Sequence, residues 1–290
     1  MSDACTQGID TGFVALGYFK VAFLGVVQGI TELLPISSTA HMRLVPAVLG
    51  WPDPGSAFSA AMQLAALGAV VSYFWTDVRD LTVNSISAAI HGRFRDRSFQ
   101  FALWIVLATI PIGIAGLTLA KLLNSCHSPL RAVSVIGWTC LVMGALLVVA
   151  EIWARHSRTI AKATLTDALI VGLAQTGALI PGVSRSGSTL TAALLLGFKR
   201  DEAARLSFLL GLPAIALAGL KELWELHKLH LDWHAWSVLW LGIGVAAVSA
   251  FFAIWGLMKT LENFSTWPFA LYRFLLGIVI LAGVAMGWLA

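Results

Sequence analysis

The sequence predicts an all-α integral membrane protein in which six transmembrane helices combine with two re-entrant helical hairpins. The 290-residue chain is 58% hydrophobic and only 12% charged, with a mean hydropathy of +0.83, whereas soluble domains carry about 25% charged residues. A helix needs about 20 apolar residues to cross the hydrocarbon core of a bilayer. Six segments meet this requirement, at about 57–75, 100–120, 131–151, 203–223, 235–258 and 268–288. We predict that residues 1–290 form a single polytopic membrane domain.

Two further apolar segments are interrupted and are predicted to form the hairpins. Residues 13–50 are apolar as far as Leu34 and then meet Pro35 and a run of hydroxyl side chains. Residues 165–198 meet Pro181 and a similar polar run before the apolar residues resume. Non-helical backbone at membrane depth is tolerated only where protein buries it or where it lines a wet cavity. A helix, a break and a short returning helix satisfy that condition.

The order of elements in the two halves of the chain is the same. A Gly-x-x-Gln sequence precedes each break, at Gly25–Gln28 and at Gly172–Gln175, and three spans follow each broken segment. A hairpin returns to its own side of the membrane and three spans cross to the other side, so the second half starts from the opposite face. We therefore predict an inverted-topology repeat, with halves of about 1–155 and 156–290 and a site where they meet.

Basic residues predict how the chain is oriented in the membrane. The net charge of +4 is better explained by the excess of Lys and Arg in cytoplasmic loops than by nucleic-acid binding. Eight full spans are the alternative topology, but they would move the cluster at 199–205 to the other side of the membrane. With six spans, three basic segments share the cytoplasmic side: the loop at 76–99 (Arg79, Arg93, Arg95, Arg97), the loop at 152–164 (Arg155, Arg158, Lys162) and the turn holding Lys199, Arg200 and Arg205.

The first polar stretch carries ionisable and hydroxyl groups where the surrounding sequence predicts membrane. Ionisable groups at membrane depth are costly and are functional candidates by default. Gln28 and Glu32 share a helix face, and Glu32 is a candidate metal ligand or proton acceptor, or else a structural carboxylate. Ser38 and His41, three residues apart, form a minimal nucleophile–base pair. Ser37, Ser38 and Thr39 suit the start of a short helix. They would cap that helix, and its free N–H groups there would also suit an anion.

The second polar stretch surrounds an arginine with hydroxyl groups. Pro181-Gly182 allows a sharp backbone turn, and a new helix is predicted near Leu190. The guanidinium of Arg185 presents a fixed fork of donors that matches phosphate oxygens, and further donors come from Ser184, Ser186, Ser188 and Thr189. Arg43 and Arg273 are weaker candidates. Arg273 is expected to extend toward the membrane interface rather than to take part in a site.

These residues resemble a known family, the bacterial undecaprenyl-diphosphatases, also called bacitracin-resistance proteins. The first family signature is Glu/Gln-x-x-x-Glu followed by Pro-x-Ser-Ser-Thr-x-His, and the chain has it at Gln28–Glu32 and Pro35–His41. The second is Pro-Gly-x-Ser-Arg-Ser-x-x-Thr, present at Pro181–Thr189. Ser207–Leu210 and the Tyr272-Arg273 pair are also similar to the family. The resemblance covers essentially the full chain.

The resemblance implies hydrolysis of undecaprenyl diphosphate to undecaprenyl phosphate and inorganic phosphate. This reaction recycles the lipid carrier of peptidoglycan synthesis, on which cell shape depends. It also gives bacitracin resistance, since bacitracin binds the lipid diphosphate. A divalent cation, Mg²⁺ or Ca²⁺, is implied, together with an inner (plasma) membrane location and a site facing the periplasm. Many members have Glu where this chain has Gln28, so the metal is expected to bind through Glu32, the diphosphate and water. The expected partners are the lipid diphosphate and membrane lipids but no nucleic acid, and a homodimer is left open.

The expected catalytic residues are Glu32, Ser38, His41 and Arg185. Arg185 would clamp the diphosphate while Ser38 attacks the terminal phosphorus and His41 takes the serine proton. Glu32 would bind the metal or orient His41, and a His41 or water nucleophile stays open. The expected substrate contacts are Gln28, Ser37, Thr39, Gly182, Ser184, Ser186 and Thr189. A polyprenyl-phosphate transporter built on the same inverted repeat is the alternative function, followed by a purely structural subunit.

Overall fold

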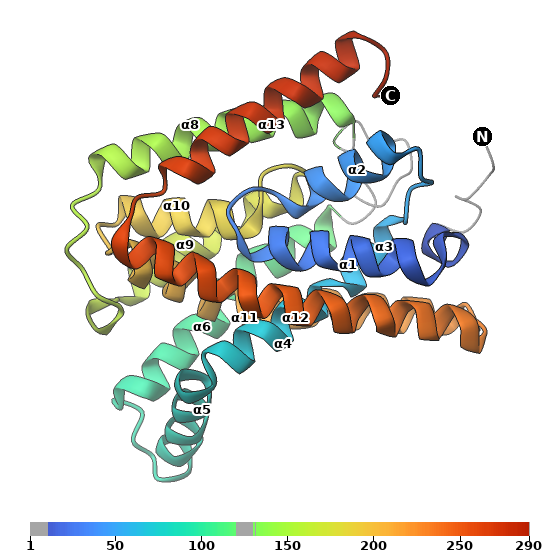
Figure 1. Ribbon diagram of the computed structural model, residues 1–290. Helices are drawn as coiled ribbons and strands as arrows, with labels where there is room; N and C mark the ends of the chain where they lie inside the picture. Colours follow the sequence, from blue (N-terminus) through green and yellow to red (C-terminus); the bar gives the residue numbers. More distant parts are fainter. Residues whose placement is uncertain (1–10, 120–129, 131, 290) are drawn as a thin grey trace.

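The computed structural model describes residues 11–119, 130 and 132–289, and in these residues the chain is helical between its turns, with a single isolated bridge from Arg158 to Phe198 (Figure 1). Six of the described helices are long and apolar enough to cross a membrane, which confirms the predicted all-helical multi-pass fold. They are η1 with α1 (Gly12–Leu33), α6 (Arg97–Thr118), α8 (Val133–Trp153), α11 (Arg200–Lys228), α12 (Trp233–Asn263) and α13 (Trp267–Ala285).

The region around residue 75 differs from its prediction. Five of the expected spans coincide with α6, α8, α11, α12 and α13, but the expected span at 57–75 consists of α3 (Ser56–Ala61) and α4 (Gln63–Tyr73). The chain then turns by 83° into α5 (Trp75–Ile90), where we expected a loop. Counted as one broken span, this bent pair would bring the total to seven.

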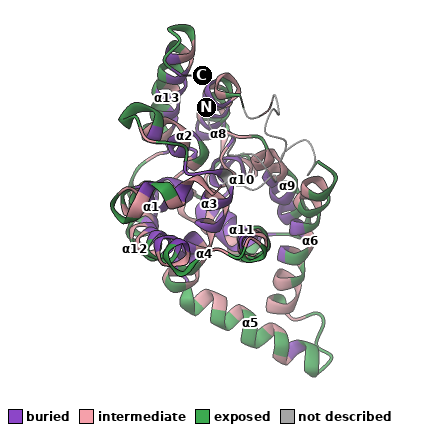
Figure 2. Cartoon of the chain, turned by 90° about the vertical axis from the view of Figure 1, so that its right-hand side faces the viewer, coloured by how far each residue is buried: buried purple, intermediate pink, exposed green. Residues whose placement is uncertain are grey.

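Helix α5 has three faces, which explains why its polar sequence is still helical. One face, including Val78, Leu81, Ser85 and Ala88, is at least partly buried, and the Ser85 hydroxyl donates to the Ser98 carbonyl at 2.9 Å at the start of α6. A second face is apolar and exposed, and a third is polar and exposed. Figure 2 shows α5 extending sideways from the bundle, mostly exposed. The exposed apolar face consists of Trp75, Val83, Ile86 and Ile90, and the polar one includes Thr76, Asp80 and Asn84.

Both predicted breaks are present. Helix α1 (Gly17–Leu33) is followed by α2 (Ser38–Leu49), and α9 (Leu165–Gln175) with η4 (Thr176–Leu179) is followed by α10 (Arg185–Leu195). The expectation that the last of these helices starts near Leu190 was wrong, because the Ser184 hydroxyl accepts from the Gly187 N–H at 3.2 Å and caps the helix earlier. That the two broken segments are re-entrant stays a prediction.

The two broken segments are built alike at their second helices. The same number of residues separates Gln28 from Ser37 and Gln175 from Ser184. Ser37 and Ser184 both have a positive φ, 73° and 70°, and each is the N-cap of its helix through its own hydroxyl. The inverted relation of the halves, about 1–155 and 156–290, stays a prediction.

Glycines allow each broken segment to pack closely on a span from the other half. A Cβ at Gly29 of α1 would lie 2.3 Å from the Ala246 carbonyl oxygen of α12. A Cβ at Gly172 of α9 would lie 2.3 Å from the Ala108 carbonyl oxygen of α6. Small residues permit such close approach of helices in membranes. Each half therefore holds the first helix of the other half's broken segment.

The three basic segments meet at one end of the helices. The Lys199 N–H donates to the Arg158 carbonyl at 2.9 Å, and Arg97 Nη2 donates to the Ala163 carbonyl at 2.7 Å. Arg205 forms an ion pair with Asp77. These contacts do not favour the eight-span alternative, which moves residues 199–205 to the other side of the membrane. Which side is cytoplasmic stays a prediction.

Candidate active site

The two breaks meet in the middle of the bundle, so that the two polar stretches of the sequence form one site. The Ser186 hydroxyl at the start of α10 is 3.2 Å from the Glu32 carbonyl oxygen and 3.1 Å from that of Leu34. Carbonyl oxygens only accept, so the serine donates to the end of α1. The catalytic candidates predicted on the two stretches are therefore neighbours.

Arg273 of α13 joins the tips of both broken segments. Its guanidinium donates to the Pro35 carbonyl at 3.2 Å and to the Gly182 carbonyl at 2.8 Å. Further contacts go to the carbonyls of Val183, Thr139 and Cys140. Only 1% of the residue is exposed, so the expectation that Arg273 extends to the interface was wrong. Main-chain carbonyls from three segments satisfy its donors, which allows the charge to remain buried.

Glu32 is the centre of the site and is 7% exposed. The Ser38 hydroxyl donates to its Oε2 at 2.6 Å, and Gln28 Nε2 donates to the same oxygen at 3.0 Å. Its Oε1 lies 3.6 Å from Arg185 Nη2. The short contact points the Ser38 proton at a carboxylate, and hydrogen bonds to an ionised acceptor are stronger than neutral ones. The arrangement can take a proton from the serine.

His41 is held by groups other than Ser38. Its Nδ1 lies 2.7 Å from the Ser37 carbonyl oxygen, which can only accept, so Nδ1 carries a proton. In a neutral imidazole, Nε2 then accepts from the Tyr272 hydroxyl, at 2.6 Å. The two rings are stacked, with centroids 5.6 Å apart. No hydrogen bond found in the described residues joins His41 to Ser38, so the geometry favours Glu32 as the proton acceptor. Tyr272 had been noted only for its resemblance to the family.

Arg185 is buried with unused donors. Its side chain is 10% exposed, and neither Nη1 nor Nη2 has a hydrogen-bond partner within the part of the chain that the structure describes. A Cβ at Gly211 of α11 would lie 2.1 Å from Nη1, so this glycine provides the space for the guanidinium. Gln175, fully buried, also has both amide atoms unpaired there. A buried donor without a hydrogen-bond partner costs free energy. A bound phosphate would offset that cost by accepting hydrogen bonds from these donors.

Most of the other predicted contacts bind within the protein. Ser37 and Ser184 cap their helices, and Ser186 joins α10 to α1. Thr189 donates to the Arg185 carbonyl at 2.7 Å and contacts Ser207, while the Gly182 carbonyl accepts from Arg273. Roles of these residues toward a substrate stay predictions.

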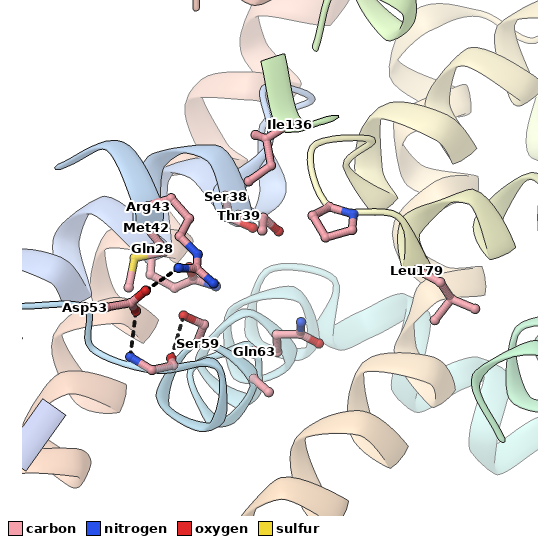
Figure 3. A pocket seen from close by; sticks show the side chains of 13 residues that line it. Gln28, Ser38, Thr39, Met42, Arg43, Asp53, Ser59, Gln63, Ile136 and Leu179 are labelled. Carbon is pink, nitrogen blue, oxygen red and sulfur yellow. Dashed lines mark hydrogen bonds and ion pairs between the residues drawn. The ribbon is translucent and has the colours of Figure 1, made fainter. Parts of the chain in front are cut away.

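A cavity of about 220 Å³ opens beside Ser38 (Figure 3). Predicted residues Gln28, Ser38 and Thr39 line it. The wall facing them includes Ser59 and Gln63, which the sequence analysis missed because they lie in the apolar segment 57–75. Their polarity within that segment was the available signal. The remaining lining residues are Met42, Arg43, Asp53, Gly55, Ala60, Ile136, Leu179 and Pro181.

A model of the family described as "Bacitracin resistance protein BacA" matches residues 21–279. The chain belongs to the BacA family. Both signatures and all the residues of the BacA-family site named above lie within the matched range, so the resemblance seen in the two motifs extends over nearly the whole chain.

Curated relatives support the same family. A Mesorhizobium japonicum protein named "Undecaprenyl-diphosphatase 2" is 73% identical over 264 residues, which cover 91% of this BacA-family chain and all of that protein. "Undecaprenyl-diphosphatase" proteins of Synechococcus elongatus and Gloeobacter violaceus are each 46% identical. The alignments cover 94% of this chain and, respectively, 96% and 94% of those proteins.

Proposed function

We propose that this BacA-family protein hydrolyses undecaprenyl diphosphate to undecaprenyl phosphate and inorganic phosphate. The observation that carries the proposal is the 2.6 Å hydrogen bond from Ser38 to Glu32, beside Arg185 and facing a cavity. The names of the relatives support the substrate and the reaction. A transporter needs no hydroxyl directed at a carboxylate, so the polyprenyl-phosphate flippase alternative is not favoured. The product is the lipid carrier of cell-wall synthesis, and removal of the diphosphate to which bacitracin binds gives resistance.

The first step is attack on the terminal phosphorus. Ser38 Oγ forms the new P–O bond while its proton passes to Glu32 Oε2, and the bond to the lipid-linked phosphate breaks. Undecaprenyl phosphate leaves, and Ser38 carries the phosphoryl group. Water then attacks that phosphorus, and the bond between phosphorus and Ser38 Oγ breaks. The proton held by Glu32 returns to Ser38 Oγ, Glu32 takes a proton from the water, and it releases that proton to solvent before the next turnover. Inorganic phosphate is released.

Positively polarised groups stabilise the transferred phosphoryl group. Phosphoryl transfer is catalysed mainly by positioning and electrostatic stabilisation. Arg185 supplies unused guanidinium donors, and helix α2 begins at Ser38, so the positive end of its helix dipole lies beside the nucleophile. His41 and Tyr272 hold the far side of that turn through the Ser37 carbonyl.

The residues present fit a divalent cation that the protein shares with its substrate. Among the described residues, no three His, Cys, Asp or Glu side chains are grouped closely enough to hold an ion by themselves. However, Gln28 Oε1 is a buried oxygen with no partner there, four residues from Glu32 on the same helix face. Mg²⁺ is often held by one or two protein oxygens together with phosphates and water. When bound, Mg²⁺ or Ca²⁺ would neutralise charge on the phosphates, with Glu32 and Gln28 as its protein ligands.

The basic end of the helices supports a location and an orientation. Cytoplasmic loops carry an excess of Lys and Arg, and the segments around Arg97, Arg158 and Lys199 gather at one end. The cavity is lined by α3 and by the first half of α2, and α3 lies toward the opposite end (Figure 1). These features support our proposal of a bacterial inner-membrane location with the site open to the periplasm. The proposed partners of the protein are membrane lipids and the lipid diphosphate, and not nucleic acid. Measuring the mass of the purified protein in detergent tests whether it forms a homodimer.

Phosphate release tests the proposal directly. The protein is purified in detergent and supplied with undecaprenyl diphosphate, with Mg²⁺, with Ca²⁺ or with chelator. We expect release that depends on the cation, its loss in Ser38→Ala and Arg185→Ala, and no change in Ser85→Ala on α5, away from the cavity. Labelled substrate should leave phosphate on wild-type protein but not on Ser38→Ala.

Each contrary outcome has a definite meaning. Label on His41 would make the histidine the nucleophile, and Ser38→Ala at full activity would exclude the serine step. No release by well-folded wild type would reject the phosphatase and leave lipid transport in liposomes as the assay to run.

A further inference from the structure

Among the described residues that line it, the cavity beside Ser38 has one cation and one anion. Arg43 is the cation and Asp53 the anion, and the other lining residues are neutral. A lipid diphosphate that enters carries several negative charges. Arg185 does not line this space, because it is buried behind Glu32. Of the described arginines, Arg43 is therefore the one whose side chain lines the cavity.

Helix α2 turns Arg43 toward the cavity, as it does the proposed nucleophile Ser38. Residues four apart on a helix share a face, and both Ser38 with Met42 and Thr39 with Arg43 line the cavity. Arg43 is five residues beyond Ser38, or about 7.5 Å along the axis at 1.5 Å per residue. Figure 3 shows its guanidinium directed across the cavity toward Asp53. A second phosphate, beyond the one at Ser38, is within reach of this long side chain.

The partner of Arg43 can be exchanged for a phosphate. Arg43 Nη1 lies 2.5 Å from Asp53 Oδ2, but the two side chains are 36% and 41% exposed. Ion pairs at such exposure are worth only about 0–1 kcal/mol. Asp53 is also fixed by the Gly55 N–H, which donates to its Oδ1 at 2.9 Å. The aspartate is therefore held in place while the arginine is free to leave it.

We infer that Arg43 recognises the lipid-linked phosphate of the substrate and that Asp53 holds the guanidinium in position until the ligand displaces it. This inference rests on the proposed function, since it assigns the second phosphate of the same diphosphate. It makes Arg43 a binding residue, whereas Arg185 acts at the phosphoryl group that is transferred.

Binding of the product, undecaprenyl phosphate, tests the inference without hydrolysis. This product carries only the lipid-linked phosphate. In detergent we expect Arg43→Gln to raise its Kd about tenfold, the lower end of the range for a charged hydrogen bond because the site is half-exposed, and Arg43→Lys to recover part of that loss. Asp53→Asn keeps the acceptor for the Gly55 N–H but removes the competing charge, so its Kd should fall. Arg79→Gln, an exposed arginine on α5, should bind like wild type.

Steady-state kinetics give the second readout. Arg43→Gln should raise KM for undecaprenyl diphosphate about tenfold while kcat stays within about twofold, because the variant leaves Ser38, Glu32 and Arg185 in place. The inference is overturned if Arg43→Gln binds the product as tightly as wild type, if wild type does not bind it, or if Asp53→Asn weakens binding as Arg43→Gln does. In the last case the pair is only structural. A wild type that binds product but releases no phosphate would reject the proposed function and leave the role of Arg43 standing.

Discussion

Replacing Gly182 by Ala should push the tip of the second broken segment away from α8. Gly182 has φ = +92°, and a Cβ there would lie 2.0 Å from Thr139 Oγ1 and 2.9 Å from both the Cα and the carbonyl oxygen of Ile136. Thr139 is held by its own bond to the Pro181 carbonyl, at 2.9 Å. Ile136 contributes backbone atoms of α8, which can move only with the helix. The added methyl group is therefore accommodated by moving the tip.

The expected destabilisation has two parts. A positive φ in a residue with a Cβ costs about 1–2 kcal/mol, and overpacking in a close-packed region costs about 1–3 kcal/mol. Together they predict that Gly182→Ala lowers the free energy of unfolding by about 2–5 kcal/mol. Moving the tip would also lengthen the 2.8 Å bond from Arg273 to the Gly182 carbonyl, so the position of the whole tip is affected.

Gly92 provides the matched control. It has φ = +66°, but a Cβ there would meet no atom within 4 Å, so Gly92→Ala carries only the backbone cost of about 1–2 kcal/mol. Thermal unfolding of both variants in the same detergent measures the difference. Phosphate release should fall about 100-fold in kcat/KM for Gly182→Ala, because a shift of about 1 Å in a site has that effect, and should be unchanged for Gly92→Ala.

Two results would refute this reasoning. Equal unfolding temperatures for the two variants would mean that the contact of the tip with α8 contributes nothing to stability. Full activity in Gly182→Ala would mean that the position of the tip does not set the geometry at Arg185.

Three further predictions concern the site and the membrane. Glu32→Gln should lower kcat by about 10²–10⁴ because it removes the proton acceptor. Rates of phosphate release at saturating substrate and cation will check this, and an unchanged kcat would remove the carboxylate from proton transfer. Tyr272→Phe should lower kcat/KM only a few-fold, since it removes one hydrogen bond to His41 worth about 1 kcal/mol, and a loss as large as that of Glu32→Gln would give the hydroxyl a direct role. In bilayers, α5 should lie with its apolar face in the lipid and its polar face in water. A spin label at Ile86 should then be more accessible to oxygen, which dissolves in lipid, and a label at Asn84 more accessible to a water-soluble nickel complex. Equal accessibilities at the two positions would contradict this placement.

Much of the site could be predicted because polar residues in an apolar sequence are conspicuous. Glu32, Ser38, His41 and Arg185 were selected on that ground, and the structure brings them to one place. The breaks after Pro35 and Pro181 were predicted for the same reason: proline and hydroxyl side chains interrupt an apolar helical pattern. These signals are local, so they can be recognised without knowing the fold.

The features that were missed depend on contacts between distant segments. Arg273 is buried because carbonyls from three other segments converge on it, and nothing near it in the sequence shows that. The partner of His41, Tyr272, is on another helix. The hydrogen bond of Ser38 to Glu32 rather than to His41 depends on how the chain folds back after Pro35. Helix α5 was taken for a loop because its packed side is a minor part of a polar sequence.

The contacts of Arg273 have a consequence for how this family can vary. The arginine holds both tips through main-chain oxygens only, and every residue offers the same oxygen. Apart from Gly182, which lies against α8, the side chains at the tips can therefore change, and with them the shape presented to a ligand, without loss of these bonds. A carboxylate partner would instead have fixed one residue type and added a negative charge next to Glu32. The link between the two broken segments thus constrains their backbone geometry more than the identity of their side chains.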